Sequence, residues 1–177
     1  PGGAEYAEQC RVPRGRLTVV MNTVDTAHLQ ADAEALSADD LDEFRRRNKI
    51  GNGRQFAYLG GLDASKRVAF LAETLDALYR RGSDVHLVVG GAGSESRLLE
   101  AARLRGQVSM LGHVSGAAKA AILKSSIGIV NPGRVGLLAV DALTVGRPVL
   151  TTDWRYHAPE IEYLKEGTSL LTSADSV

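Results

Sequence analysis

From residue 55 onward, short apolar runs alternate along the chain with longer segments in which apolar residues recur every three or four positions. The short runs have the length of buried strands, whereas the longer segments have the spacing of amphipathic helices. The predicted strands are 55–61, 84–91, 108–112, 127–131 and 148–153, with a sixth candidate at 169–172. The predicted helices are 65–82, 94–106, 116–126 and 136–145, with Ser65 and Ser94 as the expected N-caps of the first two.

The alternation of strands and helices predicts the fold class. The strands are apolar along their whole length rather than at every second residue, which is typical of a parallel sheet covered on both faces. Right-handed crossovers between successive parallel strands place helices on both sides of such a sheet. We therefore expect an α/β protein with a Rossmann-like, doubly wound parallel sheet.

Residues 1–50 follow a different pattern. The run 16–25 reads as a strand. Ser37, followed three residues later by Asp40, has the spacing of a capping box and predicts a helix that continues to about Arg47. This part of the chain is either the first unit of the same sheet or a separate linker.

The segment GNGR at 51–54 has the composition of a flexible joint. We accordingly divide the chain into residues 1–50, a linker with its strand and helix, and residues 51–177, the Rossmann-like domain. Because the chain begins at Pro1 and not at Met, we expect it to be a piece of a longer protein.

The composition is that of a soluble globular protein, with 44% apolar and 24% charged residues in a chain of 177. Lys plus Arg and Asp plus Glu number 21 each, so the charge offers no footprint for nucleic acid or a membrane surface. We find no transmembrane segment and no secretory signal. The single cysteine, Cys10, fits a reducing compartment, and we expect a cytoplasmic protein.

Glycines stand at the ends of several predicted strands. Ligands of open parallel sheets bind beyond the carboxyl ends of the strands, where glycine lets the backbone approach closely. We therefore expect a ligand cleft along this rim. The glycines concerned are Gly60, Gly61, Gly90, Gly91, Gly112 and Gly133.

The segment NPGRVGLLAVDALTVGRPVL, residues 131–150, adds a chemical hypothesis. Gly136, Leu137 and Leu138 should present free N–H groups at the first turn of the predicted helix, where an anion such as phosphate binds favourably. Asp141 follows about one and a half turns later beside an apolar face. We interpret Asp141 as an acceptor for ribose or sugar hydroxyl groups.

Four stretches in this order resemble a known family. They are VVMNTVD (19–25), YLGGLDASK (58–66), VSMLGHVSGAAKAAIL (108–123), and the opening of 131–150 with GRPVLTTD (146–153) and PEI (159–161). Together they are similar to the carboxyl-terminal, donor-binding half of GT-B glycosyltransferases of the retaining, family 4 type. The resemblance implies a domain that binds a nucleotide-diphosphate sugar.

The resemblance also implies roles for individual residues. Lys66 matches the lysine that pairs with the diphosphate, and the stretch around His113 matches the place where backbone groups contact the base. Lys66 and Asp141 are the expected catalytic residues. The expected donor-binding residues are Gly60, Gly61, Gly90, Gly91, Gly112, His113, Gly133, Val135, Gly136 and Leu137.

The chain departs from the family pattern at three positions. Gly61 stands where the family commonly has an arginine. Of two glutamates that flank the donor helix in the family, the first aligns with Gly133 and the second with Asp141. The second position keeps an acid, whereas sugar recognition at the first must use backbone or other groups.

The resemblance implies transfer of a sugar with retained anomeric configuration, without a metal ion or a cofactor other than the donor itself. The sequence contains an Asp-x-Asp, Asp40-Leu41-Asp42, but these acids fall in the first turn of a charged helix, where they suit the helix dipole. The histidines are scattered, and His86 lies inside a predicted strand as a core or edge residue. We predict no metal site.

The acceptor, a glycan, lipid or small molecule, would be held by a missing N-terminal domain, so the isolated domain should be inactive. The nucleotide base, the sugar and the oligomeric state stay open. The cluster Trp154–His157 either touches donor or acceptor or only packs on the body.

One alternative function is that of a nucleotide-binding or regulatory module without transferase activity. A dinucleotide-dependent enzyme is another, but no G-x-G-x-x-G follows the first strand.

Overall fold

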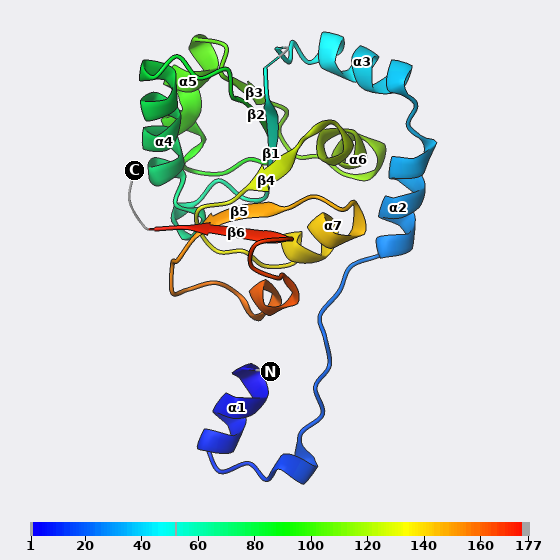
Figure 1. Cartoon of the computed structure of the whole chain (residues 1–177), viewed down its shortest axis with the longest axis vertical. Coiled ribbons are helices and arrows are strands. Elements are labelled where there is room, and N and C mark those ends of the chain that lie inside the picture. The colour runs from blue at the N-terminus through cyan, green and yellow to red at the C-terminus, as the bar shows by residue number, and fades with distance from the viewer. Residues whose placement is uncertain (1, 52, 175–177) are drawn as a thin grey trace.

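Six parallel strands form one sheet in the order β3-β2-β1-β4-β5-β6 (Figure 1). This is a computed structural model, and it describes residues 2–51 and 53–174. The predicted Rossmann-like fold class is confirmed, and each strand predicted from residue 55 onward is present, most of them two residues shorter than expected. The strands are β1 Gln55–Leu59, β2 His86–Gly90, β3 Val108–Met110, β4 Gly128–Val130, β5 Val149–Thr152 and β6 Leu170–Ser173.

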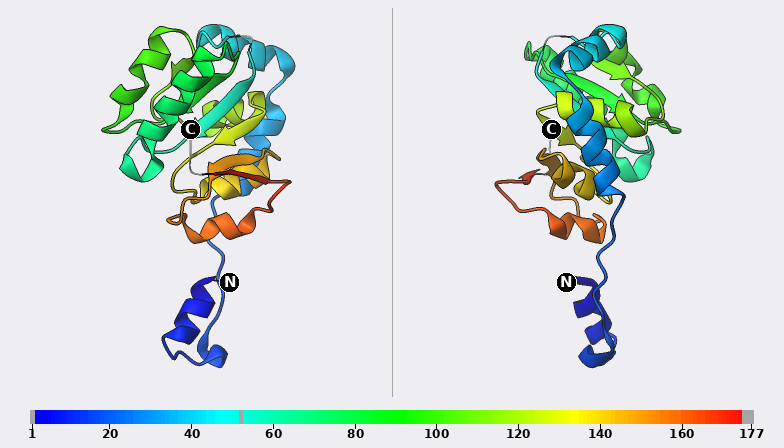
Figure 2. Two further views of the ribbon diagram at one scale, coloured as in Figure 1. Left: turned by 60° about the vertical axis from the view of Figure 1, so that its left-hand side comes forward. Right: turned by 90° about the vertical axis from the view of Figure 1, so that its right-hand side faces the viewer.

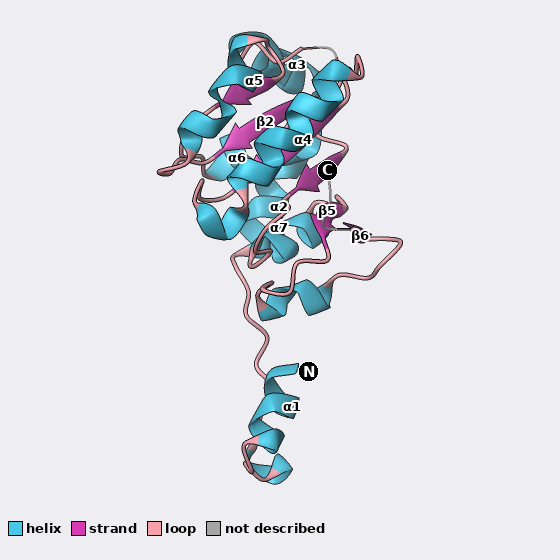
Figure 3. Cartoon of the chain, turned by 90° about the vertical axis from the view of Figure 1, so that its left-hand side faces the viewer, coloured by secondary structure: helices cyan, strands magenta, loops and turns pink. Residues whose placement is uncertain are grey.

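Helices cover both faces of the sheet, and Figure 3 shows α4 and α5 in front of the strands with α6 behind them. One face packs on α4 (Val68–Arg80) and α5 (Glu100–Leu104), and the other on α2 (Thr26–Ala35), α6 (Gly116–Ser125) and α7 (Leu138–Thr144). Successive residues of β1 face opposite layers, because side chains alternate along a strand. Ala57 and Leu59 join the core under α6, and Tyr58 joins the core under α4. No helix within the described residues is long and apolar enough to cross a membrane.

The strand predicted at 16–25 is wrong. Residues 14–16 form a short 3-10 turn (η1), and 17–25 run as an extended chain that pairs with no strand (Figure 2). The run lies instead against a 3-10 helix, η4 (Pro159–Tyr163), where the Asn22 N–H donates to Tyr163 Oη at 2.9 Å. These β-favouring residues pair with no strand of the sheet. Their local preference for an extended backbone therefore does not produce a strand, because a strand also needs a hydrogen-bonded neighbour.

Two helices near the amino terminus were not predicted from the sequence. The first, α1 (Gly2–Gln9), lies at the end of the molecule farthest from the sheet, beyond the extended run (Figure 2). The second, α2, packs against α6, and its Leu29 is only 5% exposed. Residues 26–35 are therefore part of the layered body.

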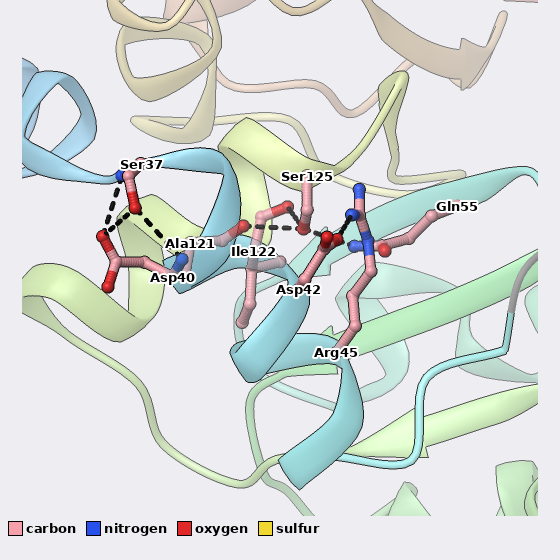
Figure 4. Close-up of polar contacts among 8 residues, drawn as sticks. All are labelled: Ser37, Asp40, Asp42, Arg45, Gln55, Ala121, Ile122 and Ser125. Carbon is pink, nitrogen blue, oxygen red and sulfur yellow. Dashed lines mark hydrogen bonds and ion pairs between the residues drawn. The ribbon is translucent and has the colours of Figure 1, made fainter.

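The helix predicted from the Ser37 capping signature is confirmed as α3 (Ala38–Arg47). Figure 4 shows the reciprocal bonds: Ser37 Oγ accepts from the Asp40 N–H at 3.2 Å, and the Asp40 carboxylate accepts from the Ser37 N–H at 2.9 Å. The same view shows Gln55 Nε2 donating to Ser125 Oγ at 2.6 Å, which ties β1 to α6. Of the joint predicted at 51–54, Asn52 lies outside the described residues, and the others form no helix or strand.

The predicted caps Ser65 and Ser94 do not cap their helices. The Asp63 carboxylate accepts from the Ser65 N–H at 2.9 Å and starts a 3-10 turn, η2 (Ala64–Lys66). Arg67 then adopts a left-handed conformation (φ 54°), so α4 begins three residues later than expected. Local side-chain bonds to the backbone compete with helix formation, and they delay the helix here. The second helix likewise begins after a 3-10 turn, η3 (Ser96–Leu99).

Candidate functional site

A pocket of about 480 Å³ opens at the carboxyl ends of the central strands. β1 and β4 are neighbours, but the chain leaves β1 toward α4 on one face and leaves β4 toward α7 on the other. This reversal is the position at which doubly wound sheets form a crevice. The pocket is lined by Leu59, Gly60, Gly61, Lys66, Gly90, Gly91, Ala92, His113, Val114, Lys119, Gly136, Leu137, Leu138 and Asp141.

Most of the site residues predicted from the sequence line this one pocket. They are Gly60, Gly61, Lys66, Gly90, Gly91, His113, Gly136, Leu137 and Asp141. The other predicted residues, Gly112, Gly133 and Val135, are not in the lining. Gly112 pairs with Gly91 in an isolated bridge, and its φ of 68° suits glycine. Val135 has a fully buried side chain, and its N–H donates to His157 Nδ1 at 3.3 Å.

Glycine is required at Gly91 and Gly133 because backbone segments meet there. A Cβ on Gly91 would lie 1.8 Å from the carbonyl oxygen of Gly60, so the loops after β1 and β2 touch only without a side chain. A Cβ on Gly133 would lie 2.5 Å from the carbonyl oxygen of Ser65 and from the carbonyl carbon of Lys66. The position therefore has no room for any side chain while the two loops remain in contact.

Lys66 is one of two partly buried lysines in the pocket lining, the other being Lys119. Its ammonium group donates to the carbonyl oxygen of Arg134, on the loop that follows β4. Burial lowers the pKa of Lys66, while the nearby carboxylate of Asp63 acts in the opposite direction and Arg134 lowers the pKa further. A cation that is partly desolvated is well suited to receive an anion, because the charge interaction is less screened.

The backbone between β4 and α7 supplies hydrogen-bond donors to the same pocket. The N–H groups of Gly136, Leu137 and Leu138 have no acceptor within the described part of the chain. The regular helix begins at Leu138, whereas the sequence predicted a start at Gly136. These donors thus belong to a loop and the helix that follows it.

Asp141 is paired with a residue that the sequence analysis missed. Lys119 Nζ lies 2.7 Å from Asp141 Oδ1, and the exposed fractions of the two side chains are 26% and 10%. Lys119 stands on α6 among glycine and alanines, which is a weak signal for a polar role on a packed helix. Its partner is 22 residues away in the chain, so no local spacing could have identified the pair.

Arg67 is a second residue that the sequence analysis did not single out. Its Nη1 donates to Thr152 Oγ1 at 2.9 Å and to the Pro132 carbonyl at 3.4 Å. Arg67 thereby ties the loop after β1 to the ends of β4 and β5. Arg67 does not line the pocket itself, but it holds together loops that do.

His86 and the aromatic cluster at 154–157 lie outside the pocket, unlike His113. His86 is 5% exposed within β2, as predicted, with Nε2 at 3.0 Å from Ser109 Oγ, and burial lowers its pKa. Trp154 contacts Tyr156 and His157 edge to face, and none of them lines the pocket. The described residues contain no group of three or more His, Cys, Asp or Glu side chains that could hold a metal ion.

A second hollow, of about 310 Å³, lies beside α4 on the sheet face away from α6. Its lining contains no titratable side chain and is largely apolar, with residues such as Phe56, Phe70 and Leu150. It therefore lacks the groups that would carry chemistry, and the pocket at the strand ends is the candidate site.

Comparison with known sequences identifies relatives that carry out sugar transfer. Residues 53–177 match the family described as glycosyl transferases group 1. The chain is 26% identical over 156 residues to an alpha-D-kanosaminyltransferase of Streptomyces kanamyceticus, which covers 84% of the chain and 39% of that protein. It is 32% identical over 140 residues to a phosphatidyl-myo-inositol mannosyltransferase of Mycolicibacterium smegmatis, covering 76% of the chain and 33% of the relative. The chain thus spans less than half the length of these proteins.

Solved structures agree on the fold. A glycosyltransferase from Rickettsia africae superposes with a TM-score of 0.72 at 12% identity, covering 96% of this chain and 47% of that one. Anabaena HepE in complex with UDP and glucose superposes with a TM-score of 0.70 at 16% identity, covering 97% and 46% of the two chains. At such identities the likeness concerns the fold alone.

Proposed function

The chain belongs to the glycosyl transferases group 1 family, and we propose that its pocket binds the nucleoside diphosphate of a sugar donor. One observation carries the proposal. The ammonium of Lys66, the unpaired amides of Gly136 to Leu138, and the carboxylate of Asp141 all line one pocket at the reversal point of the sheet. A cation and free N–H groups favour phosphate, and a carboxylate favours hydroxyl groups.

In the proposed complex, the diphosphate lies against Lys66 and the amides after β4. During transfer of the sugar, negative charge grows on the diphosphate, and these fixed donors stabilise it. Asp141 accepts a hydrogen bond from a ribose hydroxyl, and the backbone beside His113 faces the base. The proposed transfer needs no metal ion, because the protein itself supplies positive charge to the leaving group.

We further propose that transfer is of the retaining type, that the sugar is a hexose, and that a preceding domain holds the acceptor. The two curated relatives named above, a kanosaminyltransferase and a mannosyltransferase, support a hexose-like sugar. The chain covers 39% and 33% of those relatives, which supports a further domain. On this proposal the 177-residue chain binds the donor but does not turn it over.

A second candidate is a nucleotide-binding or regulatory module of the same fold. Gly61 and Gly133 favour it, because both positions lack the side chains that family members commonly have there. At Gly133 the packed backbone of Ser65 and Lys66 leaves no space to regain one. A transfer assay on the full-length protein that carries this chain separates the two candidates.

Calorimetric titration of the chain with UDP, GDP and ADP, each with and without an attached hexose, tests the proposal. We expect one of these nucleotides to bind and both Lys66→Ala and Asp141→Ala to weaken it. Lys165→Ala is the matched control, because Lys165 is exposed and outside the pocket. If no nucleotide binds, or if Lys165→Ala weakens binding as much as Lys66→Ala does, the proposal is wrong.

A further inference from the structure

Lys119 and Asp141 come from different helices and meet at the wall of the pocket. Lys119 Nζ contacts Asp141 Oδ1 at 2.7 Å, and both residues belong to the pocket lining. Within the described residues, Asp141 Oδ1 is the one acceptor bonded to Lys119 Nζ, and Asp141 Oδ2 has no hydrogen-bond partner. The carboxylate is therefore held through Oδ1, and Oδ2 is left available to accept a hydrogen bond from a ligand.

The surroundings of Lys119 explain why its ammonium points to Asp141. Its neighbours along the first two turns of α6 are glycine and alanines, which offer no competing side-chain acceptor. Asp141 lies between buried apolar residues of α7, and among the described residues no second side chain donates to its carboxylate. Asp25 and Asp32 share a neighbouring hollow with Lys119, but the acceptor that its ammonium contacts is Asp141.

We propose that Lys119 is a positioning residue that orients Asp141 for recognition of the ribose hydroxyl groups of a nucleoside diphosphate. The inference rests on the proposed function. Lys119 holds Oδ1 and restricts the rotation of the carboxylate, so that Oδ2 faces the pocket and accepts from the 2′- or 3′-hydroxyl. A fixed acceptor loses less conformational freedom on binding than a mobile one.

The inference predicts a loss of discrimination between ribose and deoxygenated sugars. The probes are UDP, GDP and ADP with their 2′,3′-dideoxy counterparts, and the readout is the ratio of the two affinities for the base that binds best. We expect Lys119→Met to reduce this ratio by about tenfold, because the charge-assisted bond to the hydroxyl loses its geometry. Lys119→Arg, which keeps a charged donor, should keep most of the ratio.

Lys124 provides the matched control on the same helix. It is half-buried like Lys119, but its ammonium donates to the carbonyl oxygens of Ala33 and Leu36 at 2.7 Å each. Lys124→Met should therefore lower thermal stability without changing the ratio. An equal change of the ratio in Lys124→Met and Lys119→Met would overturn the inference, since the effect would then come from general loosening of α6.

A double variant keeps the test decisive if Lys119→Met alone does not fold. Lys119→Met combined with Asp141→Asn removes both charges, so no unpaired carboxylate is left at residue 141. We expect this variant to have the same affinity ratio as Asp141→Asn alone. A further fall on adding Lys119→Met would show that Lys119 acts directly on the ligand, and the positioning role would be wrong.

The outcomes also separate this inference from the proposed function. If none of the nucleotides binds the wild-type chain, the proposed function and the inference both fail. If a nucleotide binds and the ratio is the same in Lys119→Met and wild type, only the inference fails.

Discussion

Lys119 on α6 and Asp141 on α7 form an ion pair of 2.7 Å across two helices that cover the same face of the sheet. The carboxylate side chain is 10% exposed and the lysine side chain 26%. At such burial a charge is costly without its partner, because water no longer solvates it fully. The pair therefore links the packing of the two helices to the chemistry of the pocket that they line.

We predict that Lys119→Met lowers the free energy of unfolding by about 3 kcal/mol, because it leaves a buried carboxylate without a counter-charge. Urea denaturation followed by circular dichroism measures the change. The double variant with Asp141→Asn should be more stable than Lys119→Met alone, since the unpaired charge is gone. If Lys119→Met is as stable as wild type, the ion pair does not contribute to the free energy of unfolding.

The packing of Gly133 gives a second prediction. Gly133→Ala should lower the free energy of unfolding by about 2 kcal/mol, because the added Cβ overlaps backbone atoms that cannot rotate away. Gly15→Ala is the control, since a Cβ at Gly15 meets nothing within 4 Å. Thermal unfolding of the two variants provides the comparison. A Gly133→Ala protein as stable as Gly15→Ala would contradict the close approach of the two loops.

The strands and the glycine rim could be predicted from the sequence because they depend on local signals. Continuous apolar runs predict buried parallel strands, and strand-end glycines follow from the need for close backbone approach. Parallel strands bring their carboxyl ends to one edge, so residues as distant as Gly60 and Gly136 could be placed together. These inferences needed the order of the elements and no side-chain detail.

The remainder of the site depends on tertiary geometry. The ion pair of Lys119 with Asp141 depends on how α6 and α7 are rotated on the sheet, which no spacing in the sequence encodes. The delayed start of α4 follows from the left-handed Arg67, which is held by contacts to Thr152 and Pro132. Residues 17–25 resemble a strand locally, but they pair with neither edge strand of the sheet, β3 or β6.

The helix caps provide a third prediction with a built-in control. Ser37→Ala should cost about 1 kcal/mol of stability, because it removes the side-chain acceptor of the capping box on α3. Ser115 stands at the N-cap of α6 without a side-chain cap bond, so Ser115→Ala should be nearly neutral. Denaturant midpoints of both variants measure the difference. Equal effects at the two serines would mean that the capping box contributes no net stability.

Lys66 gives a fourth prediction, the pH dependence of donor binding. Burial places the pKa of Lys66 below the ordinary 10.5 of a lysine, and the protonated form is the one expected to bind a diphosphate. Affinity for the bound nucleoside diphosphate should therefore fall as pH rises through this lowered pKa, earlier than for an exposed lysine. Calorimetry between roughly pH 7 and pH 10 measures the fall, and Lys66→Arg should reduce it because arginine stays charged.

The contribution of Lys66 to folding stability should rise over the same pH range in which the affinity for the nucleoside diphosphate falls. Between the lowered pKa of folded Lys66 and the value of 10.5 in the unfolded chain, the unfolded state binds more protons at this residue. The Lys66 contribution to the free energy of unfolding therefore rises with pH, relative to Lys66→Arg. Weaker binding together with a rising contribution to stability excludes unfolding as the cause and assigns the loss of affinity to the ammonium charge. If affinity in wild type and Lys66→Arg falls in parallel, Lys66 does not carry that charge to the diphosphate.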